Sequence, residues 1–166
     1  MDAIRLLRDV RDVDRREWED ATGVPLERQL PFAVQHPSAW CFSIHENRPG
    51  AAPLLIWGAD RLSNKLAQVW LIATNEAARR ATSLHGTMAL SLHLLDNAYP
   101  HSVAYADARN VVHLRWLERL GWKAVGTTTA GPESLPFIQY ERAANVWSSP
   151  RHRLHGGGGG LLSRAT

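Results

Sequence analysis

The chain has 166 residues, 45% of them hydrophobic and 21% charged, which is typical of one globular domain with a buried core. No run approaches the roughly 18 consecutive apolar residues of a membrane-spanning helix, and the first twenty residues are charged throughout, so we expect a soluble protein without a secretion signal. The formal net charge is only +3, and the lysines and arginines are spread along the chain. This distribution argues against nucleic-acid binding by the folded part. The single cysteine, Cys41, cannot form an internal disulfide and is expected to be buried.

The first part of the chain predicts one strand followed by two helices. Residues 3–7 are apolar enough for an opening strand. Asp12 or Asp14 can cap a helix that stops near Gly23, and residues 26–35 predict a second helix.

Three β-rich runs follow these helices. Residues 39–46 and 53–60 are separated by a cluster of turn formers, which predicts an antiparallel hairpin. The third run, 66–74, is nearly all apolar at its centre, as expected for a strand that is covered on both faces. We therefore place this third run in the middle of the sheet.

The hydrophobic period then changes from two to between three and four residues. Apolar residues recur at that spacing over 76–98, which predicts a long helix, and Asn75 is placed to cap it. Residues 101–108 predict another strand.

Asn110 begins a short helix for which Gly121 is a natural stop. Residues 123–129 and 137–143, joined by a Gly and Pro turn, predict a closing hairpin. The whole order predicts an α+β domain over residues 1–145. The composition then shifts to a basic, glycine-rich stretch, so 146–166 is predicted to be a tail.

The segment NVVHLRWLERLGW carries a family resemblance. Its opening Asn110 and its closing Gly121 and Trp122 match the penultimate helix of the GNAT N-acetyltransferases. The resemblance implies a mixed, mostly antiparallel sheet flanked by helices. More narrowly, VWLIATN together with YADARNVVHLRWLERLGW resembles the GNAT-like internal virion protein A type proteins of short-tailed (podovirus) phages, over roughly residues 1 to 143.

The resemblance also implies a site for acetyl-CoA. The backbone of Leu71, Ile72 and Ala73 would lie along the ligand, and Asn110 near its pantetheine arm. The family holds the pyrophosphate with a glycine-rich turn at a helix start, but here the stretch is TNEAARRATSLHG, which has no glycine before its last residue and an acidic residue near the phosphates.

Arg79 and Arg80 have two interpretations. Their guanidinium groups suit phosphate geometry at an exposed helix start. They can equally lie on the solvated face of the long helix and need no ligand.

The proton donor that the family commonly takes from a tyrosine of this helix falls, by spacing from its opening asparagine, on Leu117, which cannot donate a proton. Tyr105, Asp107 and His113 are the nearby alternatives. His113 can equally be a packed or surface residue, and Asp107 can equally be a cap or turn former.

A metal site is not expected, because no second cysteine exists and the histidines are badly spaced. His85 and His93 are too far apart along one helix to share an ion.

Two functions remain open. The missing glycines and tyrosine favour a catalytically degenerate GNAT-like domain without a cofactor, in a phage virion or in the host cytoplasm during assembly. It would contact other virion proteins, in part through the tail, and could oligomerise. The alternative is an acetyl-CoA dependent N-acetyltransferase with a divergent pyrophosphate loop.

Overall fold

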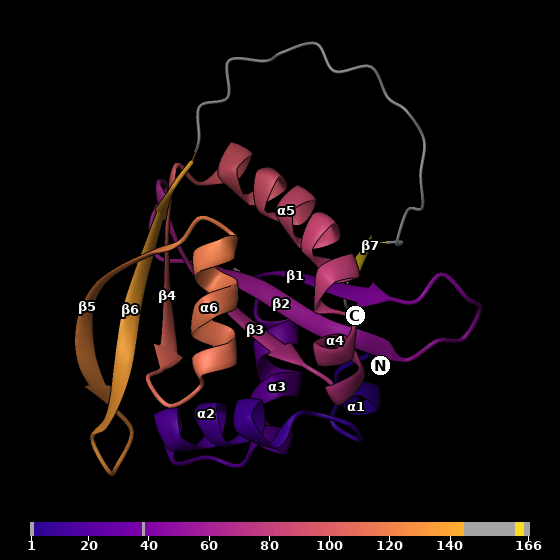
Figure 1. Ribbon diagram of the computed structural model, residues 1–166, viewed down its shortest axis with the longest axis horizontal. Helices are drawn as coiled ribbons and strands as arrows, with labels where there is room; N and C mark the ends of the chain where they lie inside the picture. The colour runs from indigo at the N-terminus through magenta and orange to yellow at the C-terminus, as the bar shows by residue number, and fades with distance from the viewer. Residues whose placement is uncertain (1, 38, 145–161, 165–166) are drawn as a thin grey trace.

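The computed structural model describes residues 2–37, 39–144 and 162–164, and it contains one mixed β-sheet with helices on both faces (Figure 1). The helices are α1 (Asp2–Leu6), α2 (Asp12–Thr22), α3 (Leu26–Gln35), α4 (Asn75–Arg79), α5 (Ala81–Ala98) and α6 (Val111–Arg119). The strands are β1 (Ala39–His45), β2 (Pro53–Arg61), β3 (Leu66–Ala73), β4 (His101–Asp107), β5 (Lys123–Ala130), β6 (Leu135–Ala143) and β7 (Leu162–Arg164).

The sheet has the strand order β5-β6-β4-β3-β2-β1-β7. Every neighbouring pair is antiparallel except β3 and β4, which run parallel because α4 and α5 carry the chain from the end of one strand to the start of the other. The predicted mixed, mostly antiparallel α+β architecture and the central position of β3 are therefore confirmed.

Alternating side chains of the central strands divide the core into two layers. Trp57 of β2 packs with Met88 and Leu92 of α5 on one face. Ile56, the neighbour of Trp57 along the strand, packs on the other face with Leu30 of α3 and with α1. The sheet thus separates the helices α4, α5 and α6 from the helices α1, α2 and α3.

The opening strand was predicted wrongly, because residues 2–6 form the helix α1. Ala3 and Leu6 are its two buried residues, and they lie three positions apart, on one face of a helical turn. They pack into the second core layer beside β2. A short apolar run does not by itself distinguish a buried strand from a buried helical turn.

The long helix differs from its prediction in two details. Its cap is Thr74, whose side-chain oxygen accepts a hydrogen bond from the backbone N–H of Ala77 at 3.2 Å, and not Asn75. The helix is also divided at Arg80, whose backbone (φ −107°, ψ 17°) ends α4 before α5 begins. The predicted second helix, the two hairpins and the Asn110 cap are confirmed.

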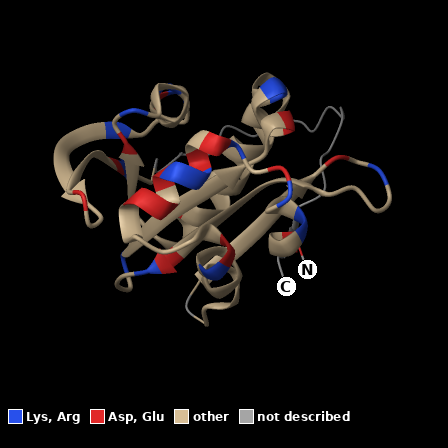
Figure 2. Ribbon diagram, turned by 90° about the horizontal axis from the view of Figure 1, so that it is seen from below, with Lys and Arg blue, Asp and Glu red and all other residues tan. Residues whose placement is uncertain are grey.

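The predicted tail, residues 146–166, lies outside the described residues except for β7, which pairs with β1. In the part of the chain that the structure describes, no helix is both long and apolar enough to cross a bilayer. Positive and negative residues stand next to one another along the ribbon (Figure 2). Cys41 is buried as expected, with an exposed fraction of 4%.

Candidate functional site

The central feature of the site is the place where β3 and β4 separate. Their parallel pairing ends with Val69 opposite Ala104, although β3 continues to Ala73 and β4 continues to Asp107. We call the space between the ends of these two strands, where they no longer pair with each other, the strand wedge. Backbone N–H and C=O groups on the inner edge of β3 need other partners there.

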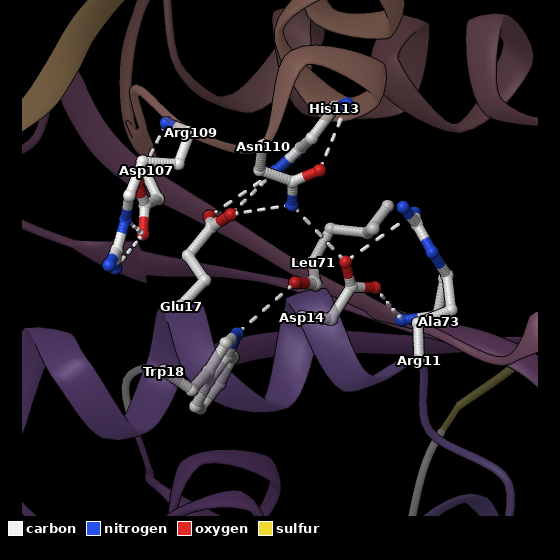
Figure 3. Close-up of polar contacts among 10 residues, drawn as sticks. All are labelled: Arg11, Asp14, Glu17, Trp18, Leu71, Ala73, Asp107, Arg109, Asn110 and His113. Carbon is white, nitrogen blue, oxygen red and sulfur yellow. Dashed lines mark hydrogen bonds and ion pairs between the residues drawn. The ribbon is translucent and has the colours of Figure 1, made fainter.

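Helix α2 supplies partners for this edge (Figure 3). The indole N–H of Trp18 donates to the carbonyl of Leu71 at 3.3 Å. The backbone N–H of Ala73 donates to Oδ2 of Asp14 at 3.0 Å, and the carbonyl of Ala73 accepts from the backbone N–H of Arg11 at 3.0 Å. The α2 region therefore occupies three backbone groups of β3 beside the wedge, namely the carbonyl of Leu71 and the N–H and carbonyl of Ala73.

The polar contacts continue through the wedge to α6. The side-chain amide of Asn110 donates to Oε2 of Glu17 at 2.8 Å and lies 3.4 Å from Oδ1 of Asp14. Nδ1 of His113 lies 3.3 Å from Oε1 of Glu17. Asp14, Glu17 and Asn110 are each less than 10% exposed. We call Asp14, Glu17, Asn110 and His113 the wedge cluster; it ties α2 on one face of the sheet to α6 on the other.

Two groups of the wedge cluster hold protons more tightly than they would in water. Burial raises the pKa of the Asp14 carboxyl, and the positive charge of Arg11 only partly offsets it. Burial by itself lowers the pKa of the His113 imidazole, but the charge of Glu17 and the hydrogen bond to it outweigh burial and raise that pKa. The contact with Glu17 therefore favours the protonated form of the His113 imidazole.

A cleft of about 230 Å³ opens on the α5 and α6 side of the wedge. Its walls include Arg11, Arg115 and Arg119, together with His113 of the wedge cluster, and the described residues that line it include no carboxylate. Small alanines from α4 and the start of α5 form part of its floor. The cleft is apolar inside and positively charged, which suits a ligand with an anionic end.

Arg79 and Arg80 are not among the residues that line this cleft. Arg79 pairs with Glu76 at 2.9 Å, and Arg80 pairs with Glu76 at 2.5 Å and with Glu46 at 2.7 Å. The turn itself is helical, so the N–H of Arg80 bonds to carbonyls of α4. Both guanidinium groups thus have carboxylate partners within the chain.

A second pocket, of about 380 Å³, lies on the α2 and α3 side of the wedge. Glu17 lines this pocket while its partner His113 lines the cleft on the opposite face. The Glu17–His113 contact therefore connects the two cavities through the sheet. Tyr105 is 39% exposed and also borders the second pocket.

Asp107 has a structural role at the end of β4. Its Oδ1 accepts the backbone N–H of Arg109 at 2.8 Å and the Nε of the same residue at 2.9 Å. Burial works to raise the pKa of the Asp107 carboxyl, but these hydrogen bonds outweigh it and hold the pKa below its usual range. Leu117, at the family's tyrosine position, is buried between α6 and the sheet.

The polar residues that sequence reasoning missed are Asp14 and Glu17 of α2. They are three positions apart, so they share one face of the helix, and that face is buried. Two acidic residues at helical spacing are ordinarily solvent-exposed, and only the partners on β3 and α6 show their role. The described residues contain no group of three or more His, Cys, Asp or Glu placed to hold a metal ion.

Comparison with known proteins identifies the fold. No protein-family model and no curated protein matches the chain. Among solved structures, a GNAT-family protein from Chromobacterium violaceum is 15% identical with a TM-score of 0.64, covering 82% of this chain and 75% of that one. A chimera of the spermidine N-acetyltransferase SpeG from Vibrio cholerae is 9% identical with a TM-score of 0.57, and the match covers 72% of this chain and 78% of the chimera.

The chain has the GNAT acetyltransferase fold. The ribosomal-protein-S5-alanine acetyltransferase from Vibrio fischeri shares it at 14% identity and a TM-score of 0.52, covering 74% of this chain and 70% of that one. Identities this low show the fold alone, so the chemistry of this GNAT-fold chain has to be argued from its own residues.

Proposed function

We propose that this GNAT-fold chain acts by binding a partner and does not transfer acetyl groups, as a virion-associated or assembly protein of a short-tailed phage. The observation that carries the proposal is the occupied edge of β3. Leu71 and Ala73 are the backbone positions along which a pantetheine arm would lie, and α2 already bonds to both.

Freeing this edge would be costly. Removing the Ala73 N–H from Asp14 would take one hydrogen bond from a buried carboxyl that keeps Arg11 and Asn110, each at 3.4 Å, and a hydrogen bond lost by a buried group costs about 1–3 kcal/mol. The Trp18 indole would lose its acceptor as well. An incoming ligand would have to offset both losses before it gained any affinity.

Two further features support the absence of acetyl transfer. Leu117 replaces the family's proton-donating tyrosine. In the turn after β3, the N–H of Ala77 bonds to the Thr74 side chain and the N–H of Arg80 bonds to α4 carbonyls, so those amides do not point at a phosphate.

The phage assignment is supported by the resemblance of VWLIATN and YADARNVVHLRWLERLGW, within a match over roughly residues 1 to 143, to the internal virion protein A type. It predicts other virion proteins as partners, within the particle or in the host cytoplasm during assembly, with the tail at 146–166 as one contact and an oligomer as one form. A specific antibody should detect the chain in purified phage particles. A chain found neither in the particles nor in assembly intermediates isolated from infected cells would exclude this assignment.

An acetyl-CoA dependent N-acetyltransferase is the second candidate. The arginine-lined cleft favours it, because Arg115 and Arg119 lie one turn apart on α6, are exposed, and have no carboxylate partner among the described residues. Several solved structures with this fold also carry acetyltransferase names. In this case the wedge would have to open when the cofactor binds.

Thermal unfolding with and without millimolar acetyl-CoA tests the two candidates. A ligand at about 100 times its Kd stabilises by roughly 2.7 kcal/mol, which raises Tm by several degrees. We expect no shift. A rise in Tm that is lost in Arg115→Glu/Arg119→Glu but kept in the control Arg28→Glu, an exposed arginine of α3 outside the cleft, would overturn the proposal in favour of the acetyltransferase.

A further inference from the structure

The sheet ends differently at its two edges. At one edge the strand β7 pairs with β1. At the other edge β5 pairs with β6, and no strand of the described residues covers its outer side (Figure 1). We call this outer side of residues 123–130 the open edge. An edge strand carries a row of backbone N–H and C=O groups that can pair with another chain.

The pairing of β6 decides which residues of β5 face outward. The carbonyl of Pro136 accepts a backbone N–H just beyond the end of β4 at 3.0 Å, so the backbone of Pro136 is directed at β4. Because backbone groups alternate along a strand, the next residue, Phe137, is directed at β5, where it stands opposite Thr128. Thr127 and Thr129, the neighbours of Thr128, therefore direct their N–H and C=O groups away from the sheet.

The sequence of β5 has few of the features that protect an edge strand from pairing. It reads KAVGTTTA, with no proline and with one charged residue, Lys123, at its start. Seven of its eight residues are exposed. A register shift lies between Ala124 and Gly126, so residues 126–130 pair regularly with β6. The stretch GTTTA is therefore a regular strand whose β-branched residues favour further pairing.

The hairpin that carries the open edge is held in place at its turn, residues 131–134. Gly131 has a positive φ of 75° and lies so close to α2 that an added Cβ would overlap the carbonyl of Asp20. Pro132 packs on the end of the same helix, where a Cβ added to Gly23 would stand 2.8 Å from its ring. The open edge is therefore presented in a fixed position, which reduces the entropy lost when another strand pairs with it.

The charges near the two ends of β5 are complementary. Lys123 lies five residues before Thr128 and Glu133 lies five residues after it. Both charged residues are exposed, and neither forms an ion pair within the part of the chain that the structure describes. If two copies pair antiparallel with Thr128 opposite itself, the two-fold axis brings Lys123 beside the turn that carries the partner's Glu133. Thr127 then exchanges backbone hydrogen bonds with the partner's Thr129.

We propose that the open edge of β5 pairs with β5 of a second copy of this chain, antiparallel and with Thr128 on the two-fold axis, so that two sheets join into one. The neighbouring registers with the same hydrogen-bond pattern set Lys123 opposite an uncharged residue, so the charges select this register. This inference rests on the proposed binding function, because it names a second copy as one of the partners. It uses no cofactor and no residue of the wedge cluster.

The test is sedimentation equilibrium of the purified full chain from micromolar to millimolar concentration. We expect a reversible dimer with twice the chain mass of 18.5 kDa. Thr129→Pro removes an outward N–H and leaves the pairing with β6 in place, so it should weaken dimerisation about tenfold or more. The matched control Thr129→Val keeps that N–H and should dimerise like the wild type.

Further variants test the register. Lys123→Glu and Glu133→Lys should each weaken the dimer severalfold, and the double variant should restore it. Thr128→Cys should form a disulfide between copies on mild oxidation, because facing residues of a non-hydrogen-bonded pair have Cα atoms about 4.5 Å apart, within the range of a disulfide. The control Thr127→Cys does not face its own counterpart and should cross-link poorly. Cys41 is buried and does not compete.

Three results would overturn the inference: a monomer at every concentration, a dimer that a normally folded Thr129→Pro leaves intact, or no rescue in the double charge variant. Failure here is distinguishable from failure of the proposed function. A monomer whose Tm is unchanged in acetyl-CoA would refute only the dimer, whereas a Tm shift in acetyl-CoA would refute the non-catalytic role whatever the mass.

Discussion

Replacing Asn110 with alanine should destabilise the fold through the wedge cluster. Asn110 donates to Oε2 of Glu17 at 2.8 Å and caps α6 by accepting the N–H of His113 at 3.4 Å. The first contact is a hydrogen bond to a buried charged group, worth about 1.5–3 kcal/mol, and loss of the cap costs about 1 kcal/mol. We expect a loss of roughly 2–4 kcal/mol in the free energy of unfolding, which lowers Tm by about 5–15 °C.

Asn75→Ala is the matched control for this measurement. Asn75 is exposed and follows Thr74, which is the residue that caps α4, so its loss should change the free energy by less than about 0.5 kcal/mol. Urea unfolding followed by circular dichroism gives both values. A loss below about 0.5 kcal/mol for Asn110→Ala, or equal losses for the two variants, would refute the view that the wedge cluster holds α2 to α6.

Three other changes probe the same region. The folded-state pKa of His113 is raised above its ordinary value of 6.5, so its stabilisation is present below that pH and is lost as pH rises through the folded pKa. Unfolding at a series of pH values should show a decline in stability above about pH 6.5 that His113→Gln flattens. Gly58→Ala would place a Cβ 2.3 Å from the Trp70 ring and should cost about 1–3 kcal/mol in denaturant unfolding, whereas Gly126→Ala, which meets nothing within 4 Å, should cost little. Thr74→Val removes the cap of α4 and a hydrogen bond to a buried carbonyl, and should lower the unfolding free energy by about 1–3 kcal/mol in the same assay.

Most of the fold could be predicted because its strands and helices carry their own periodicity. The central strand β3 was recognisable from its apolar run, and Asn110 and Gly121 mark the two ends of α6 in the sequence itself. The first helix could not be recognised, since five residues are too few to distinguish a period of two from one of three or four. Its packing against β2 in the second core layer decides the matter.

The site was predictable only in part, because its polar contacts join residues far apart in sequence. His113 and Asn110 were singled out from the sequence, yet their partner Glu17 lies more than ninety positions away and its pattern is that of an ordinary solvated helix. The arginines chosen for phosphate contact, Arg79 and Arg80, satisfy their charge locally with carboxylates. Sequence spacing does not reveal which charged residue will find a neighbour of opposite sign after folding.

The position of Asn110 bears directly on function. The resemblance places this asparagine beside a pantetheine arm, but here its amide nitrogen binds Glu17 and its oxygen binds the backbone of His113. The two amide hydrogens are directed at Glu17 and Asp14, so a ligand in the wedge would find only the second lone pair of the Asn110 oxygen. On the opposite strand α2 occupies the carbonyl of Leu71 and both backbone groups of Ala73, while the same two residues line the cleft on the α5 and α6 side. The two cavities that border the wedge, the cleft on the α5 and α6 side and the pocket on the α2 and α3 side, are then where a ligand could bind with these contacts in place.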